Sequence, residues 1–191
     1  ELQFYSGGRD PQFASLRQSW LGGLIVLYNG VGGFRTLPDS IDENALSNGE
    51  IWLALAYYTR LFPQDQSTAA IVKQADRHMM RIYSAQPDAG FYSWGVKAAA
   101  QRFLATSDIR FADFAFQQTR AYLKGVGPSP DHDENSCAEV EGLAAAQGLL
   151  RSMARRDDRL ELRLQKRIDA DMAVNSALQI QPGQARIELG H

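Results

Sequence analysis

Leu143-Ala-Ala-Ala146 is the last of three alanine-rich stretches in this chain, after Leu53-Ala-Leu-Ala56 and Ala98-Ala-Ala100. The central alanines of the three stretches are 45 and 46 residues apart. A repeat of this length, with two helices in each unit, is typical of an array of helical hairpins. The alanine spacing therefore predicts three consecutive hairpins.

The central alanines, Ala54, Ala99 and Ala145, are expected at close contacts between helices. Small side chains let a helix approach its neighbours on both sides, so the alanine-rich helix of each hairpin is predicted to lie in an inner layer. The other helix of each pair is charged, as in residues 165–171. Such a helix should lie outside, with one apolar stripe turned toward the inner layer.

Helical periodicity dominates every long segment, and sustained alternation of the strand type is not found. The expected fold class is therefore all-α. We expect long loops at one end of the hairpins, including 87–94, and short breaks at the other end. The period fits part of a closed (α/α) toroid and, alternatively, an open α-solenoid. Helices are predicted at 12–29, 47–61, 67–84, 96–104, 109–124, 136–153 and 160–180.

The bulk composition excludes several classes of protein. The chain has 191 residues with 45% hydrophobic residues and a formal net charge of −2, which predicts one globular helical domain over residues 1–191. A nucleic-acid partner is not expected because no basic stripe is present. The longest apolar stretch, 20–28, is far shorter than the roughly 20 residues of a membrane span. Neither a targeting signal nor a localisation can be assigned from these residues.

Three motifs resemble the six-hairpin (α/α) toroid glycosidase-like superfamily. A Gly32-Gly-Phe34 loop follows a predicted outer helix, Ser47-Asn-Gly-Glu50 opens an inner helix, and Glu139-Val-Glu-Gly-Leu-Ala-Ala-Ala146 opens another. The resemblance covers about residues 13–180. Six hairpins of this length would need roughly 270 residues. The chain is therefore expected to be an incomplete toroid or a piece of a longer protein.

The resemblance implies a glycan site at the end of the hairpins that carries the long loops. Carboxylates there would act as general acid and base, and aromatic rings would stack on sugars. Cleavage of a glycosidic bond needs two carboxyl groups about 5–5.5 Å or 6.5–9.5 Å apart. The alternative to a catalytic role for the acidic residues is a structural one, as caps of helix N-termini. Ser47 and Glu50, for example, have the spacing of a capping box. The candidate catalytic residues are Glu139, Asp133 and Glu50, and the candidate substrate-binding residues are Phe34, Phe91, Tyr92, Trp94, His132 and Glu141.

No metal and no cofactor are expected. Asp131, Asp133 and Asn135 match the first three ligand positions of an EF-hand loop, but Ser136 and Gly142 stand where that loop needs Gly and Glu. One cysteine and three histidines are too few for a Cys-rich zinc site. His78, in an outer helix, is expected to be a surface or packing residue.

Two functions from different classes remain open. The first is a carbohydrate-active domain that binds or processes a glycan at its loop-end cleft by carboxylate chemistry, as a hydrolase, lyase or epimerase if it is catalytic. The second is a non-catalytic helical scaffold that binds a protein partner or a sugar. Paired carboxylates facing one cleft would favour the first, and acidic residues that only cap helices would favour the second.

Overall fold

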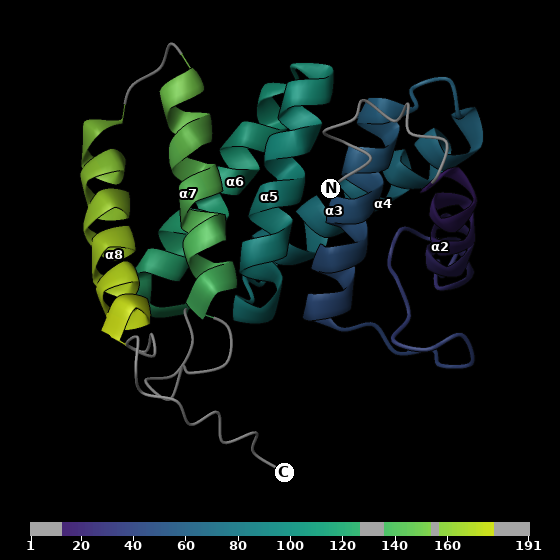
Figure 1. The fold of residues 1–191 in the computed structure, drawn as a ribbon, viewed down its shortest axis with the longest axis horizontal. Helices are drawn as coiled ribbons and strands as arrows, with labels where there is room; N and C mark the ends of the chain where they lie inside the picture. The colour runs from purple at the N-terminus through teal and green to yellow at the C-terminus, as the bar shows by residue number, and fades with distance from the viewer. Residues whose placement is uncertain (1–12, 127–135, 154–156, 178–191) are drawn as a thin grey trace.

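The fold is all-α, as predicted (Figure 1). The structure is a computed structural model that describes residues 13–126, 136–153 and 157–177. Within these ranges the only β pairings are two isolated bridges, Tyr28 with Phe34 and Arg35 with Glu43. The helical elements are α2 (Ala14–Val26), α3 (Ala45–Leu61), α4 (Gln66–Ala85), α5 (Ala89–Thr106), α6 (Ile109–Ala121), the π-helical turn η2 (Tyr122–Val126), α7 (Ser136–Ser152) and α8 (Asp158–Ala177).

An Asn or Asp side chain begins each helix from α3 to α6, because the first backbone N–H groups of a helix need an acceptor. Asn44 accepts from the Ser47 N–H at 2.7 Å, so the predicted capping box of Ser47 and Glu50 is wrong. Asp88 accepts from the Gly90 N–H at 2.8 Å. Asp88 is thus the N-cap of α5, which begins at Ala89, within the range 87–94 that was predicted to be a loop.

The helices form two layers (Figure 1). The inner layer consists of α3, α5 and α7, which lie side by side, and α4 and α6 lie behind it. Residues 62–65 join α3 to α4, and residues 107–108 join α5 to α6. These connections make antiparallel hairpins, so α3, α5 and α7 begin at the same end of the array.

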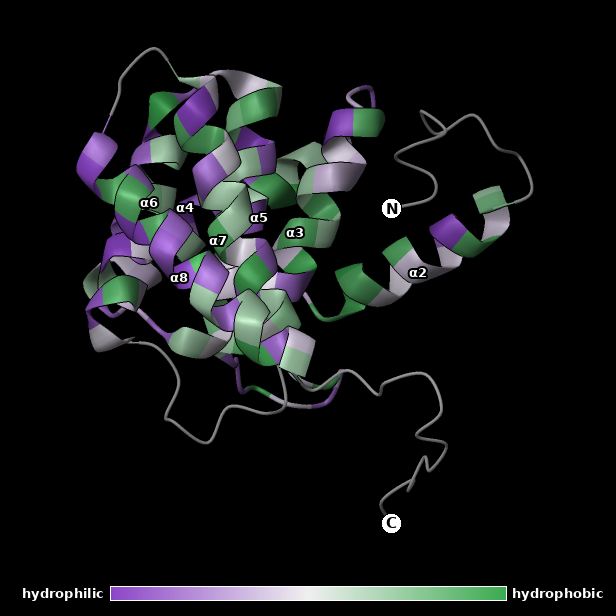
Figure 2. Cartoon of the chain, turned by 60° about the vertical axis from the view of Figure 1, so that its left-hand side comes forward, coloured by the Kyte–Doolittle hydropathy of each residue, from purple (hydrophilic) through white to green (hydrophobic). Residues whose placement is uncertain are grey.

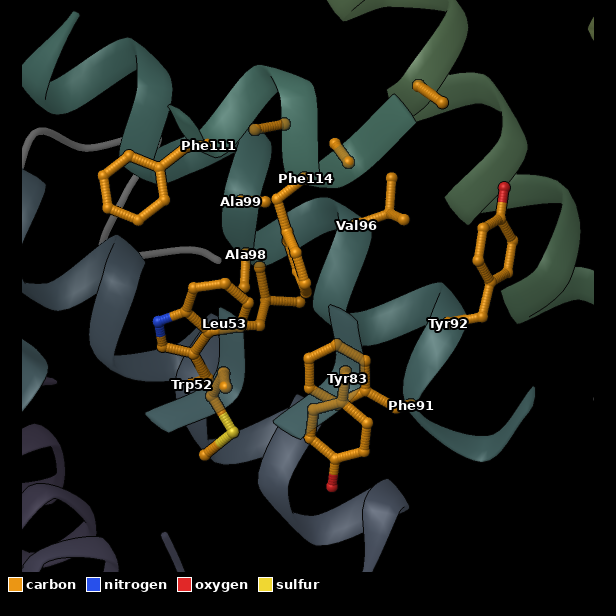
Figure 3. Packing of buried hydrophobic residues seen from close by; sticks show 14 of the residues in the cluster. Trp52, Leu53, Tyr83, Phe91, Tyr92, Val96, Ala98, Ala99, Phe111 and Phe114 are labelled. Atoms are coloured by element: carbon orange, nitrogen blue, oxygen red, sulfur yellow. The ribbon is translucent and has the colours of Figure 1, made fainter. Parts of the chain in front are cut away.

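The core lies between the two layers and is built from aromatic rings and alanines (Figure 3). Trp52 of α3 stacks on Phe91 of α5 with the ring centroids 6.0 Å apart, and Phe114 of α6 meets both rings edge-on. Ala98 and Ala99 are fully buried beside them. The small side chains let α5 pack against its neighbours, as the alanine spacing predicted.

The repeat holds only partly for the three central alanines. Ala99 is fully buried, Ala145 is half-buried and Ala54 is exposed. The prediction that all three are buried at close helix contacts is therefore confirmed for Ala99, holds only in part for Ala145 and is wrong for Ala54. The reason is its place in the array: α5 has inner helices on both sides, whereas α3 is the first inner helix of the described part and has one such neighbour.

One buried ion pair joins three helices. The Arg102 guanidinium of α5 donates to both carboxylate oxygens of Asp76 on α4, at 2.7–3.0 Å. The Trp52 indole N–H of α3 donates to the same carboxylate at 2.9 Å. The side chains of Asp76 and Arg102 are only 9% and 13% exposed. Burial raises the pKa of Asp76, and the hydrogen bonds from Arg102 oppose that rise.

We expect Ala99→Leu to lower the free energy of unfolding by about 1–3 kcal/mol, because the added methylenes would enter a filled core. Ala54→Leu is the matched control, since the same change at an exposed helical position should alter stability by about 0.5 kcal/mol or less. Urea denaturation followed by circular dichroism would measure both. Equal midpoints for the two variants would contradict the packing described for α5.

We expect Asp76→Asn to destabilise the fold by about 3–5 kcal/mol, because it leaves the Arg102 charge buried without a counter-charge. Arg151→Gln provides the comparison. It removes the pair between Arg151 and Glu161, whose side chains are 56% and 36% exposed, and should change stability by about 1 kcal/mol or less. Thermal unfolding of both variants would measure the two losses of stability. The loss for Asp76→Asn must be several times that for Arg151→Gln if the buried pair holds the layers together.

Candidate functional site

Four polar or aromatic side chains form a row on the inner layer. Glu50, Trp94 and Glu141 are each the sixth residue of their helix, in α3, α5 and α7 respectively. Glu50 and Glu141 are exposed, and Trp94 is half-buried. Lys97, one turn after Trp94, completes the set. We call these four residues the inner-face row.

Lys97 connects the row. Its ammonium group lies 2.6 Å from the Glu141 carboxylate and 4.0 Å from the centroid of the Trp94 ring. Because the Glu141 side chain is 63% exposed, the ion pair adds little to stability. The contacts instead hold a cation over the face of an aromatic ring. The row therefore presents a ring, a donor and acceptors close together.

Two glycines bring the inner helices close together at this row. A Cβ added to Gly49 of α3 would lie 2.8 Å from the Trp94 Cβ, and one added to Gly142 of α7 would lie 2.9 Å from the Ser93 Cα. Both distances are shorter than real Cβ contacts allow. Glycine at these two positions therefore sets the spacing of α3, α5 and α7 where the inner-face row lies.

Three of the four rings predicted to bind substrate are core residues. Phe34, Phe91 and Tyr92 are 0–2% exposed. Phe91 stacks on Tyr83 with centroids 3.6 Å apart, and Tyr92 stacks on Tyr122 at 4.1 Å, so these rings offer no free face to a sugar (Figure 3). The cause is the early start of α5, which turns Phe91 and Tyr92 inward as helical residues. Trp94 alone is not a core residue: it is half-buried, and Lys97 covers one face of its ring.

Glu139 lies in the first turn of α7 and is half-buried. Its carboxylate accepts a hydrogen bond from the Tyr122 hydroxyl at 2.9 Å. Arg167 of α8 donates to that hydroxyl at 3.3 Å and pairs with Asp171 at 2.8 Å. Burial first, and then the Glu139 carboxylate, raise the pKa of Tyr122 above its usual range. The phenol therefore stays protonated and remains a donor to Glu139.

The predicted catalytic residues do not all meet in the described part of the chain. Asp133 and His132 lie outside the described residues. Glu50 and Glu141 lie on α3 and α7, with α5 between them. Adjacent packed helices are about 8–10 Å apart, which places α3 and α7 roughly 16–20 Å from one another. A whole helix therefore separates the backbones of Glu50 and Glu141.

A second polar cluster was missed by the sequence analysis. The His78 Nε2 of α4 lies 2.9 Å from the Glu43 carboxylate, and the Asn48 amide of α3 donates to the same carboxylate at 3.0 Å. The Asn48 oxygen also accepts from the Phe34 N–H at 2.8 Å. The cluster thus fixes the loop before α3 against α3 and α4.

The glycines of this loop were the one sequence signal for that cluster. Gly32 has φ +118°, and a Cβ added there would lie 2.6 Å from the His78 Cβ. A Cβ added to Gly33 would overlap the Glu43 carboxylate, at 2.1–2.2 Å. The Gly32-Gly33 pair is therefore required by close approach and, at Gly32, by left-handed backbone geometry.

Comparisons with family models, curated proteins and solved structures found no match for this chain. Within the described ranges, no cluster of three or more His, Cys, Asp or Glu side chains could hold a metal ion. None of the helices described is both long and apolar enough to cross a membrane.

We expect Gly142→Ala to lower the stability by about 1–3 kcal/mol, because its methyl group would force α7 away from α5. Gly148→Ala, on the same helix, is the control. No atom lies within 4 Å of a Cβ added at Gly148, so alanine there should raise stability by about 0.5–1 kcal/mol. Chemical denaturation would measure the stability of both variants. If Gly142→Ala stabilised the protein, the close contact of Gly142 with Ser93 of α5 would be ruled out.

Proposed function

We propose that the inner face of α3, α5 and α7 binds a glycan, and that the chain is part of a carbohydrate-active domain of the (α/α)-toroid type. The observation that carries the proposal is the inner-face row. Glu50, Trp94 and Glu141 stand at the same position of successive inner helices, and Lys97 contacts both Trp94 and Glu141. Such a surface suits an extended ligand that crosses the helices.

The chemistry of the row matches what a sugar offers. The apolar face of a pyranose ring can stack on Trp94, as other apolar groups stack on indole. The carboxylates of Glu50 and Glu141 can accept hydrogen bonds from sugar hydroxyls, and Lys97 can donate to them. Further along the inner helices, Arg60 donates to Gln101 at 2.6 Å, which extends the polar surface beyond the ring.

The row on its own favours binding over cleavage, because Glu50 and Glu141 are separated by a whole helix. If the domain is catalytic, we propose Glu139 as the acid or base. It is the acidic candidate with the most defined hydrogen-bond environment, supplied by Tyr122. Asp133 remains the proposed second carboxylate, on the resemblance to toroid enzymes. Its position is outside the described residues.

A scaffold without a sugar site is the second candidate. The burial of Phe34, Phe91 and Tyr92 favours it, because these rings stabilise the core and leave no aromatic platform. The two candidates differ in what they require of Trp94. A glycan site needs its ring face, whereas a scaffold needs only the Cβ that contacts Gly49.

We expect Trp94→Ala to weaken glycan binding about five- to tenfold, because the substitution removes a stacking surface. The Cβ against Gly49 is retained, so the fold should persist. Isothermal titration with neutral gluco- and manno-oligosaccharides and with oligouronates of six residues would measure the affinities.

Trp94→Phe is the matched control and should keep most of the affinity, since it keeps a ring. Glu141→Gln should weaken binding less than Trp94→Ala does. If none of the three probes binds the unsubstituted protein, or if Trp94→Ala binds as well as Trp94→Phe, the glycan proposal fails and the scaffold takes its place.

A further inference from the structure

An open apolar groove runs between α2 and α3. Its volume is about 720 Å³. On the α2 side the wall includes Leu16, Trp20 and Leu24, and Leu16 and Trp20 are 44% and 68% exposed. Figure 2 shows α2 standing apart from the other helices. Apolar side chains this exposed in one groove are typical of a docking surface.

Both walls of the groove have helical spacing. Leu16, Trp20 and Leu24 are four residues apart along α2, and Ala54, Tyr57 and Leu61 follow at three and four along α3. At 1.5 Å per residue, α2 and α3 are about 20 and 25 Å long. Two such stripes facing one groove match the apolar face of an amphipathic helix, which contacts its partner at i, i+3, i+4 and i+7.

The groove lies where the inner layer would continue. Among the described helices, α5 has inner-layer neighbours on both sides, α3 and α7, whereas α3 has only α5. A helix in the groove would therefore pack on the side of α3 away from α5, between α3 and α2, whose Arg17 lies over the Phe62 ring at one end of the groove. The small side chain of Ala54 leaves room for that approach.

The charged residues of the inner helices predict how a helix bound in the groove would be aligned along α3. Glu141, the sixth residue of α7, pairs with Lys97, the ninth residue of the preceding inner helix. Glu50 is the sixth residue of α3 and lines the groove, where it forms no ion pair with any residue that the structure describes. By the same geometry, a helix that precedes α3 would place a basic side chain against Glu50.

We propose that this groove binds an α-helix of a partner protein, which runs parallel to α3, turns a stripe of small and apolar residues toward Ala54, and pairs a Lys or Arg with Glu50. The groove is lined by Glu50 and Trp94 of the inner-face row as well as by α2, so a partner helix and a glycan would exclude one another there, and the two proposals are tested with separate ligands.

A synthetic peptide can stand in for the partner helix. The sequence of residues 89–106 is suitable, because in the fold it already packs as an inner helix and presents Lys97 to the next one. The peptide would carry Phe in place of Trp94, and the protein would carry Trp94→Phe. Trp20 is then the one tryptophan in the groove, since Trp52 is fully buried. Binding should shift the emission of Trp20 to shorter wavelength and saturate.

Two sets of variants test the position of the helix. Ala54→Arg should weaken peptide binding at least tenfold, and Ala144→Arg, at an exposed alanine of α7, should leave it unchanged. Glu50→Lys should weaken binding up to about fivefold. A peptide with Glu in place of Lys97 should recover the affinity for Glu50→Lys. Circular dichroism of each variant would verify that the helices are intact.

Three results would overturn the proposal. One is equal binding by Ala54→Arg and the unsubstituted protein. Another is an equal Trp20 shift with a peptide of scrambled sequence, which would indicate an unspecific apolar surface. The third is a concentration-dependent dimer in sedimentation experiments that Ala54→Arg abolishes, because the groove would then be occupied by a second copy of the chain.

Discussion

The buried carboxylate of Asp76 determines how the two layers of this protein fit together. A buried charge is stable only when it has a counter-charge and hydrogen-bond donors, and Asp76 finds these on two other helices, as Arg102 of α5 and Trp52 of α3. A shift of α4 along the inner layer would break these contacts. Since α3 and α5 carry Glu50, Trp94 and Lys97, the buried pair also fixes the position of the exposed row on the opposite side of those helices.

Helix content and layering were predictable because they follow from local patterns. The period of 3.6 identified the helices to within a few residues at most of their ends, and the alanine spacing identified α3, α5 and α7 as one layer. The start of α5 was missed because 87–94 was predicted to be a loop, whereas Asp88 caps a helix that begins at Ala89. That single error moved Phe91 and Tyr92 from the core to a supposed binding surface.

Other features depend on contacts that no local pattern contains. Ala54 is exposed because, in the described part of the chain, α5 is the one inner-layer helix beside α3, and the alanine spacing alone does not contain this information. Glu43 and His78 are 35 residues apart and meet only because α4 folds back on α3. Among the candidate site residues, Glu50, Trp94 and Glu141 lie in the first two turns of the inner helices, although Trp94 was predicted to lie in a loop. The distances between these residues depend on how the helices pack and could not be predicted from the sequence.

The short connections between helices influence how the protein unfolds. Each hairpin makes most of its contacts within itself or with its neighbours, which is the condition for regional rather than global unfolding. Of the described helices, the first and the last make the fewest core contacts, since α2 buries only Leu21 and α8 buries Leu160 and Leu164. Backbone amides there should exchange with solvent before those of α3, α4 and α5. Helices α2 and α8 would thus unfold locally while α3, α4 and α5 stay folded, and α2 could adjust its distance from α3 without disturbing the core.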